Sequence, residues 1–299
     1  MTGDDLIVVK GAGDMATGVA LRLHRAGLRL LMTEIAAPTV VRRSVAFAEA
    51  VFAGETAVED VRARRCADPA EAAALDPEII PVLVDPEAEV VRQLRPTVLV
   101  DGIMAKRNLG TRLDDAPVTI ALGPGFVAGR DVHAVVETQR GHYLGRVILD
   151  GSAEPDTGVP GNIGGYTRER VLRAPADGRL VEPAPIGAWV SPGDTVAWVD
   201  DQPVQAAIHG TLRGLLREGL PVSAGMKVGD VDPRAERAHC FTVSDKSLAV
   251  GGGALEAVLY LVRQRCPRQA ARYRRTIGVH DDCHRSDEGN LRARSRALD

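Results

Sequence analysis

The stretch that decides the fold is Leu6-Ile7-Val8-Val9-Lys10-Gly11-Ala12-Gly13-Asp14-Met15-Ala16-Thr17-Gly18. Its opening apolar run is typical of a strand buried on both faces, and residues 14–25 then carry apolar side chains at helical spacing. Gly11 permits the tight turn, Gly13 permits close approach of a pyrophosphate to the backbone, and Ala16 replaces the third glycine of a dinucleotide fingerprint. Because a helix N-terminus offers unpaired N–H groups to an anion, the stretch predicts a phosphate-binding turn.

A doubly wound sheet is predicted around this turn. Further short β-branched runs occupy residues 28–32, 79–84, 98–100 and 118–122, and helical patterns separate several of them. Alternation of this kind implies right-handed crossovers and a parallel sheet covered by helices on both faces. We therefore expect an α/β chain that opens with a Rossmann-like nucleotide-binding domain over residues 1–160, with ligands at the carboxyl ends of its strands.

Three side chains beyond the turn would select the nucleotide. Glu34 stands where an acid binds a ribose 2′-hydroxyl, whereas Arg42 and Arg43 would instead accept a 2′-phosphate or another anion. Asp14 argues against routine binding, because its carboxylate would repel a pyrophosphate, and a nucleotide-like fold that has lost its ligand is the alternative. The predicted cofactor-binding residues are Gly11, Gly13, Asp14, Met15, Ala16, Thr17, Gly18, Glu34, Arg42, Arg43, Gly123 and Gly125.

A second group of polar residues follows the Gly123-Pro124-Gly125 turn. If residues 131–138 are extended, Asp131, His133 and Glu137 share one face of the strand. Such groups do acid–base work, bind an anion or ligate a metal, or else they form a solvent-facing edge with salt bridges. No metal site is expected, since the spacing matches no standard ligand pattern. The predicted catalytic residues are Asp131, His133, Glu137, Arg140 and His142.

Two weaker candidates remain. Lys106 and Arg107 follow the strand at residues 98–100, where they would neutralise a phosphate or belong to an ordinary loop. Cys240 is a candidate thiol for handling sulfur or selenium, although a buried and inert cysteine is the better default. The chain has only 4 Lys beside 33 Arg, which a coding bias explains, yet each lysine merits attention.

An internal repeat with an offset of 32 residues predicts a different, smaller module over residues 165–235. Gly178-Arg179-Leu180 aligns with Gly210-Thr211-Leu212, and the run that begins at Gly187 aligns with the run that begins at Gly219. One copy cannot bury its apolar face alone, so the two copies are expected to close on each other as an all-β sandwich. The pattern resembles the barrel-sandwich hybrid of biotinyl and lipoyl carrier domains. Since the equivalent hairpin at residues 200–203 contains no lysine, neither biotin nor lipoate is expected.

The remaining regions are a helix, over residues 240–265, that packs back on the first domain and a basic, poorly ordered tail at 268–299.

The net charge of -3 is the sum of a net charge of +5 in residues 263–299 and of -8 in the rest of the chain. Hydrophobic residues make up 45% of the chain and aromatic residues 3%. We expect a cytoplasmic protein that binds neither nucleic acid nor membrane, because it has no basic signal segment, no long apolar span and no aromatic residues interleaved with the arginines of the tail. Homo-oligomerisation stays open.

Four separated motifs, in order, resemble the selenium-dependent molybdenum hydroxylase system proteins over residues 5–262. They are Val9 to Gly18, Thr33-Glu34 with Arg42-Arg43-Ser44-Val45-Ala46-Phe47, the Gly123–His142 block, and Ser244-Asp245-Lys246 before the glycine-rich helix. The resemblance implies an accessory role in the maturation of molybdenum hydroxylases of the xanthine dehydrogenase type, related to that of XdhC/CoxF-type maturation factors. Its expected partners are a molybdenum hydroxylase or the cofactor of that enzyme.

Three functional hypotheses follow, and the sequence leaves open whether the chain is an enzyme. In the first, a maturation factor binds the molybdenum cofactor or a molybdopterin nucleotide and hands it to a hydroxylase. In the second, an oxidoreductase binds NAD(P), with Glu34 or the pair Arg42 and Arg43 selecting the cofactor. In the third, a non-catalytic scaffold docks partner enzymes through its sandwich module.

Overall fold

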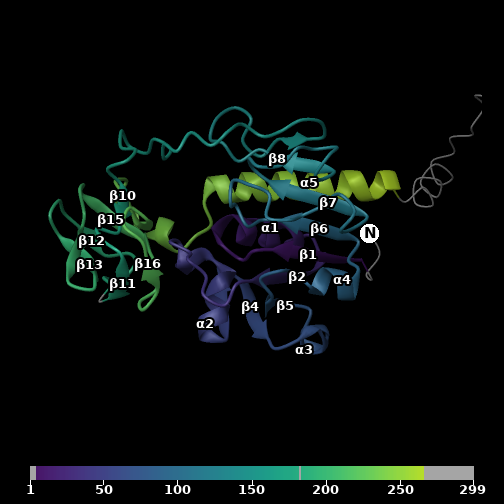
Figure 1. The fold of residues 1–299 in the computed structure, drawn as a ribbon, viewed down its shortest axis with the longest axis horizontal. Coiled ribbons are helices and arrows are strands. Elements are labelled where there is room, and N and C mark those ends of the chain that lie inside the picture. Colours follow the sequence, from purple (N-terminus) through teal and green to yellow (C-terminus); the bar gives the residue numbers. More distant parts are fainter. Residues whose placement is uncertain (1–4, 182, 266–299) are drawn as a thin grey trace, which may run out of the picture.

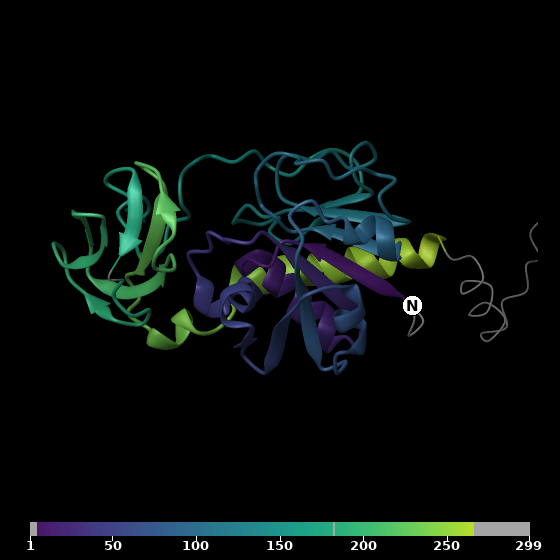
Figure 2. The same cartoon turned by 60° about the horizontal axis from the view of Figure 1, so that its bottom comes forward.

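The computed structural model describes residues 5–181 and 183–265. The tail predicted at residues 268–299 lies outside the described residues. Figures 1 and 2 show a larger body built on one sheet and a smaller all-β body beside it. An extended segment leads from the larger body to the smaller one, and the chain then returns as a long helix across the larger body.

Within the described ranges, a sheet of nine strands runs in the order β3-β4-β5-β2-β1-β6-β7-β8-β9. The strands from β4 to β8 are parallel to their neighbours, while β3 and β9 pair antiparallel at the two edges. The strands are β1 (Leu6–Lys10), β2 (Arg29–Glu34), β3 (Glu55–Val58), β4 (Val61–Cys66), β5 (Ile79–Val84), β6 (Val98–Asp101), β7 (Val118–Leu122), β8 (Ala134–Val136) and β9 (Val147–Ile148).

Helices cover both faces of this sheet. They are α1 (Asp14–Arg25), α2 (Ala50–Ala53), α3 (Pro69–Ala74), α4 (Val90–Leu94) and α5 (Asp245–Arg265). Ile7 and Val9 of β1 pack into the core that includes α1 and α5, whereas Val8 packs into the core that includes α3 and α4. Since successive strand side chains alternate between faces, burial on both faces requires the continuous apolar run seen in the sequence.

Helix α5 crosses the sheet beside α1, as Figure 1 shows. The two helices approach closely, since a Cβ atom added to Gly251 would lie 2.4 Å from the carbonyl oxygen of Gly18. A Cβ atom added to Gly18 would lie 2.6 Å from the carbonyl oxygen of Ser247. Glycine at these positions therefore brings the start of α5 to the start of α1, and this juxtaposition helps to form the site described below.

The smaller body contains two four-stranded antiparallel sheets, ordered β10-β17-β15-β12 and β14-β13-β11-β16. The repeat halves exchange strands, because β12 of the first copy pairs with β15 of the second, and β16 of the second pairs with β11 of the first. A core of small aliphatic side chains fills the space between them. The strands are β10 (Val171–Arg173), β11 (Gly178–Val181), β12 (Trp189–Val190), β13 (Thr195–Val199), β14 (Gln202–Gln205), β15 (Gly210–Leu215), β16 (Pro221–Val222) and β17 (Lys227–Asp232).

The prediction of an α/β chain is confirmed in its coarse form, with a largely parallel sheet, antiparallel sheets and a C-terminal helix. The hairpin of β3 and β4 was not predicted, because its arginine-rich second strand lacks the apolar run of a central strand. Every helix in the described ranges is too short or too polar to cross a membrane.

Candidate functional site

A cleft of about 440 Å³ opens at the carboxyl ends of β6, β7 and β8. Loops that follow these three strands form its walls, and residues 154–162 form another part of the wall. The first turn of α5 contributes Lys246. In open parallel sheets, ligands bind outside the carboxyl ends of the strands, so the topology favours this cleft as the site.

The cleft presents three cationic side chains. Lys106 binds Asp156 over 2.7 Å, and Arg140 forms two hydrogen bonds with Asp245, at 2.6 and 3.0 Å. The side-chain amine of Lys246, in contrast, makes no hydrogen bond or ion pair within the described part of the chain. Burial lowers the pKa of Lys246, and the charge of Arg140 lowers it further. An amine held in this way gains a partner when an anion enters the cleft.

Glu137 does not line the cleft but holds two of its lining residues through their backbone N–H groups. Its carboxylate is 3% exposed and accepts hydrogen bonds from the backbone N–H groups of Gln139, at 2.7 Å, and Glu154, at 2.8 Å. The same side chain therefore fixes two walls of the cleft. The sequence predicted Glu137 as catalytic, and its contacts in the structure are those of a positioning residue.

The predicted strand over residues 131–138 is wrong in extent, since β8 covers Ala134–Val136 alone. Asp131 lies in a turn before β8, where it pairs with Arg130 and accepts a hydrogen bond from Val127 N–H. The Nδ1 atom of His133 accepts a hydrogen bond from Thr119 N–H over 2.9 Å. At about 3.3 Å per residue, His133 and Glu137 stand roughly 13 Å apart along the chain, at opposite ends of β8.

The five predicted catalytic residues are therefore not brought together. Arg140 lines the cleft, whereas His142 lies in a separate, open hollow with Tyr143, against whose ring it packs edge-on. The common-face arrangement does not form, because Asp131 lies in a turn and β8 is only three residues long.

The fingerprint turn forms as predicted but is engaged with the protein itself. Gly11 has a φ of +86°, and α1 begins at Asp14 with Gly13 as its N-cap. Glu34 accepts hydrogen bonds from Ala12 N–H and Ile35 N–H, both at 2.8 Å. Burial raises the pKa of Glu34. The carboxylate expected to bind a ribose is thus bonded to the glycine-rich turn.

The other predicted members of this site also have internal partners. Thr17 donates its hydroxyl to the carbonyl of Ala12, the sulfur of Met15 meets the hydroxyl of Ser247, and Ala16 and Gly18 are buried. Gly123 has a φ of +73° and faces Thr138, while Gly125 packs on Arg107.

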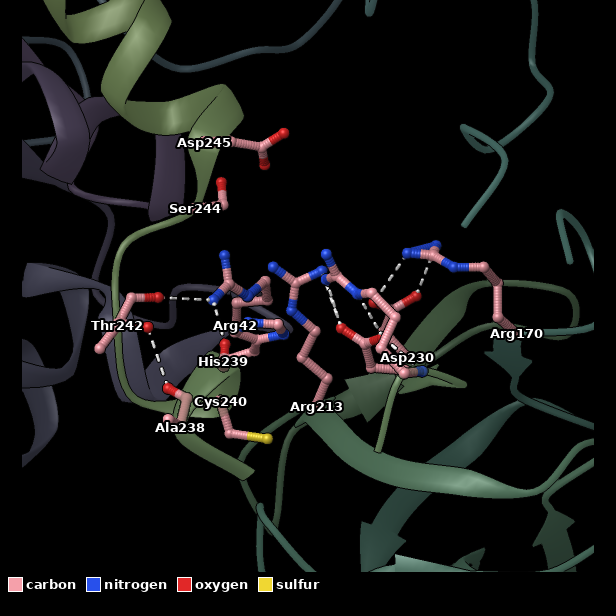
Figure 3. Close-up of polar contacts among 12 residues, drawn as sticks. Arg42, Arg170, Arg213, Asp230, Ala238, His239, Cys240, Thr242, Ser244 and Asp245 are labelled. Carbon is pink, nitrogen blue, oxygen red and sulfur yellow. Dashed lines mark hydrogen bonds and ion pairs between the residues drawn. The ribbon is translucent and has the colours of Figure 1, made fainter. Parts of the chain in front are cut away.

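The arginines predicted to select a phosphate connect the two bodies. Arg42 is 9% exposed; it pairs with Asp14 over 3.1 Å and donates to the carbonyls of His239 and Thr242. Arg43 donates to the carbonyl of Leu215 in β15. Figure 3 shows Arg42 beside His239 and Thr242.

Sequence reasoning missed Lys246 as a site residue, although one signal pointed to it. All four lysines of the chain lie at the carboxyl edge of the sheet or at its boundary with the small body. Lys10 ends β1 and binds Thr111 over 2.8 Å, Lys106 and Lys246 line the cleft, and Lys227 begins β17 beside Asp230.

A larger cleft of about 860 Å³ lies at the opposite edge, at the amino ends of β2 and β5. Its flanking cations are matched by acids, as in the pairing of Arg25 with Glu59 and Asp60, so it is a weaker candidate. Among residues 5–181 and 183–265, no cluster of three or more His, Cys, Asp or Glu side chains is placed to hold a metal ion. Cys240 is fully buried, and burial raises the pKa of its thiol, which is unfavourable for a reactive thiolate.

Comparison with known proteins gives one close sequence relative. The chain is 53% identical over 264 residues to the Escherichia coli (strain K12) protein named "Uncharacterized protein YqeB", with 88% of this chain and 49% of that protein covered. The chain therefore spans about half the length of this relative. No family model matches. A solved structure of an aspartoacylase family protein from Mesorhizobium loti is 11% identical, with 79% of this chain and 87% of that chain covered, and its TM-score of 0.26 is too low to inform fold or function.

Proposed function

We propose that this chain binds an anionic, phosphate-bearing cofactor in the carboxyl-edge cleft and acts as an accessory factor in the maturation of molybdenum hydroxylases. The observation that carries the binding proposal is Lys246, a half-buried residue whose side-chain amine lines the cleft without a hydrogen bond or ion pair from the described residues. Molybdopterin carries a phosphate and, as a nucleotide, a pyrophosphate, which suits such a group. The maturation role rests on the motif resemblance described above.

We further propose a Rossmann-like fold for the larger body and a barrel-sandwich hybrid for the smaller one. The parallel order β5-β2-β1-β6-β7 and the glycine-rich turn after β1 support a Rossmann-like larger body. Exchange of β12 and β16 between the repeat copies supports a barrel-sandwich hybrid for the smaller one. In this arrangement, the sandwich stands beside the cleft as a docking module for the enzyme that receives the cofactor.

Binding would proceed by charge neutralisation. An incoming phosphoryl oxygen accepts hydrogen bonds from Lys246 and Arg140, and its negative charge favours the ammonium form of Lys246. Glu137 keeps the walls at Gln139 and Glu154 in place during this step. The NAD(P)-dependent oxidoreductase is less well supported, because the Glu34 carboxylate is bonded to Ala12 and Ile35.

Thermal shifts and calorimetry with molybdopterin, CTP, NAD and NADP test the proposal. We expect the purified chain to be stabilised by molybdopterin or CTP, with affinity at least about tenfold weaker in Lys246→Met, since one charge-assisted contact is worth about 1.5–3 kcal/mol. Arg92→Gln, an exposed cation on α4, is the matched control and should bind normally.

Two outcomes would overturn it. Stabilisation by NAD or NADP alone, followed by hydride transfer, would establish the oxidoreductase instead. Equal affinity of the wild type and Lys246→Met for the cofactor would show that the cleft is not the binding site. For the maturation role, a cellular molybdenum hydroxylase should lose activity with Lys246→Met while retaining it with Arg92→Gln.

A further inference from the structure

The boundary between the two bodies holds a row of charged side chains that do not line the cleft. Arg42 comes from the loop after β2, Arg213 from β15, Arg170 from the residue before β10, and Asp230 from β17. Figure 3 shows the guanidinium groups of Arg42 and Arg213 beside each other, with Asp230 lying between Arg213 and Arg170. The two bodies thus place the positive charges of Arg42 and Arg213 next to each other.

Arg213 is the least satisfied member of this row. Its side chain is 6% exposed, and it makes no hydrogen bond within the described residues. Among the described residues its one ion pair, to Asp232, is long at 3.6 Å. That carboxylate is already bound by Arg234 through two hydrogen bonds, at 2.9 and 2.6 Å. Burial lowers the pKa of Arg213, and the neighbouring charge of Arg42 lowers it further.

Buried donors without partners point into the same place. The Nε atoms of Arg42, Arg170 and Arg213 are all buried without a hydrogen bond in the described part of the chain. The Nδ1 atom of His239, whose role depends on its tautomer, and the acceptor Asp230 Oδ1, which is ion-paired with Arg170, also lack a hydrogen bond there. A buried donor of this kind costs about 1–3 kcal/mol when nothing accepts from it. The three guanidinium donors outnumber the one unpartnered carboxylate oxygen, so the boundary is short of acceptors.

The charge balance gives the sign of that acceptor. Among the described residues, the ion pairs at the boundary contain more cations than carboxylates. The cations are Arg42, Arg170, Arg213, Arg234 and Lys227, and the carboxylates are Asp14, Asp230 and Asp232. Burial lowers the pKa of Lys227 as well. A group with two negative charges would match the excess.

We propose that a phosphate-class oxyanion binds at this boundary between the two bodies, against the guanidinium groups of Arg42, Arg170 and Arg213. The planar guanidinium fork matches tetrahedral oxyanions, and an oxyanion accepts from several donors at once. Because the contacting groups come from both bodies, the bound anion fixes their relative position. None of these three arginines lines the Lys246 cleft, so this inference does not rest on the proposed function.

Free phosphate and a phosphoryl group on a larger molecule share this chemistry, so the experiment uses both. Calorimetry and thermal unfolding of the full chain are run with inorganic phosphate, with sulfate and with CTP, and sodium chloride is used to match the ionic strength. We expect phosphate and sulfate to stabilise the wild type beyond chloride. If CTP also binds here, it will compete with phosphate; if free phosphate is the ligand, the two will bind together.

Arg213→Met is the decisive variant, and Arg179→Met is its control, since Arg179 is an exposed arginine on the other sheet of the small body. We expect Arg213→Met to lower phosphate affinity by about ten- to a hundredfold. In phosphate-free buffer the same variant should unfold at an equal or higher temperature than the wild type, because it removes an unsatisfied buried cation. A purely structural arginine would behave in the opposite way.

The proposal is overturned if phosphate stabilises the wild type no more than chloride does, or if Arg213→Met keeps the full phosphate response. Lys246→Met separates this inference from the proposed function. Loss of cofactor binding in that variant with an intact phosphate response would support both sites, whereas an intact cofactor response would count against the cleft alone.

Discussion

The Nη1 atom of Arg42 donates a hydrogen bond over 3.1 Å to the Oδ2 atom of Asp14. The other oxygen of this carboxylate accepts the hydroxyl of Ser247 over 2.7 Å. The first turn of α1, the loop after β2 and the first turn of α5 are therefore held by one carboxylate. Since Arg42 also reaches the carbonyls of His239 and Thr242, the same contact ties the sheet to the chain leaving the small body.

Arg42→Ala should destabilise the protein by about 2–4 kcal/mol, because it leaves Asp14 without its cation and two carbonyls without their donor. Urea unfolding followed by circular dichroism measures the change. Arg43→Ala, which removes one bond to the carbonyl of Leu215, is the milder comparison and should cost about 1 kcal/mol. Equal costs for the two variants would refute the central role of Arg42.

Gly251→Ala should destabilise the chain by about 1–3 kcal/mol, because the added Cβ atom would meet backbone of α1. Gly252→Ala is the matched control on the next residue of α5, where an added Cβ atom would meet no described residue within 4 Å. That variant should be stabilised by about 0.5–1 kcal/mol, since alanine favours a helix over glycine. Thermal melts of both variants decide the point.

The lowered pKa of Lys246 predicts a rise in stability with pH. In the unfolded chain this lysine titrates near ~10.4, above its folded value, so between the two values the unfolded state binds more protons. The free energy of unfolding should therefore increase as the pH rises from the folded pKa to the unfolded pKa. Below the folded pKa, the full cost of burying the charged ammonium is present. Lys246→Met should remove this rise; an unchanged pH profile would contradict the assignment.

Anion binding should also take up protons at alkaline pH. A phosphate beside Lys246 favours the ammonium, so its pKa rises on binding and a proton is drawn from the buffer. Calorimetric titrations in two buffers of different ionisation enthalpy measure the uptake. It should vanish in Lys246→Met, and uptake that persists there would have to come from another group.

Glu137→Gln should weaken cofactor binding by about tenfold and leave the fold intact. Glutamine keeps one acceptor oxygen, so either Gln139 N–H or Glu154 N–H loses its partner and that wall of the cleft loosens. Hydrogen exchange at these two amides reports the loosening directly.

His133→Ala is the contrasting variant to Glu137→Gln. His133 contacts Thr119 away from the cleft, so its loss should lower stability by about 1 kcal/mol and leave affinity unchanged. Reduced affinity of His133→Ala for the cofactor would show that His133 belongs to the binding site.

Local sequence determined the elements whose signal lies within a few consecutive residues. The apolar run of β1, the glycine-rich turn and the helical spacing of α1 follow from side-chain periodicity, and the 32-residue repeat predicted a paired β module. Each depends on contacts between neighbours or on an internal copy, so one sequence is enough to detect it.

Only the tertiary structure decided the site. Lys246 reaches the cleft because Gly18 and Gly251 bring α5 against α1, more than two hundred residues away along the chain. Arg42 and Glu34, which the local motif assigned to a nucleotide, are instead bonded to the protein by partners that the motif does not contain. Residue type and spacing fix which chemistry a side chain carries, whereas packing between distant segments fixes whether that chemistry is already satisfied or left for a ligand.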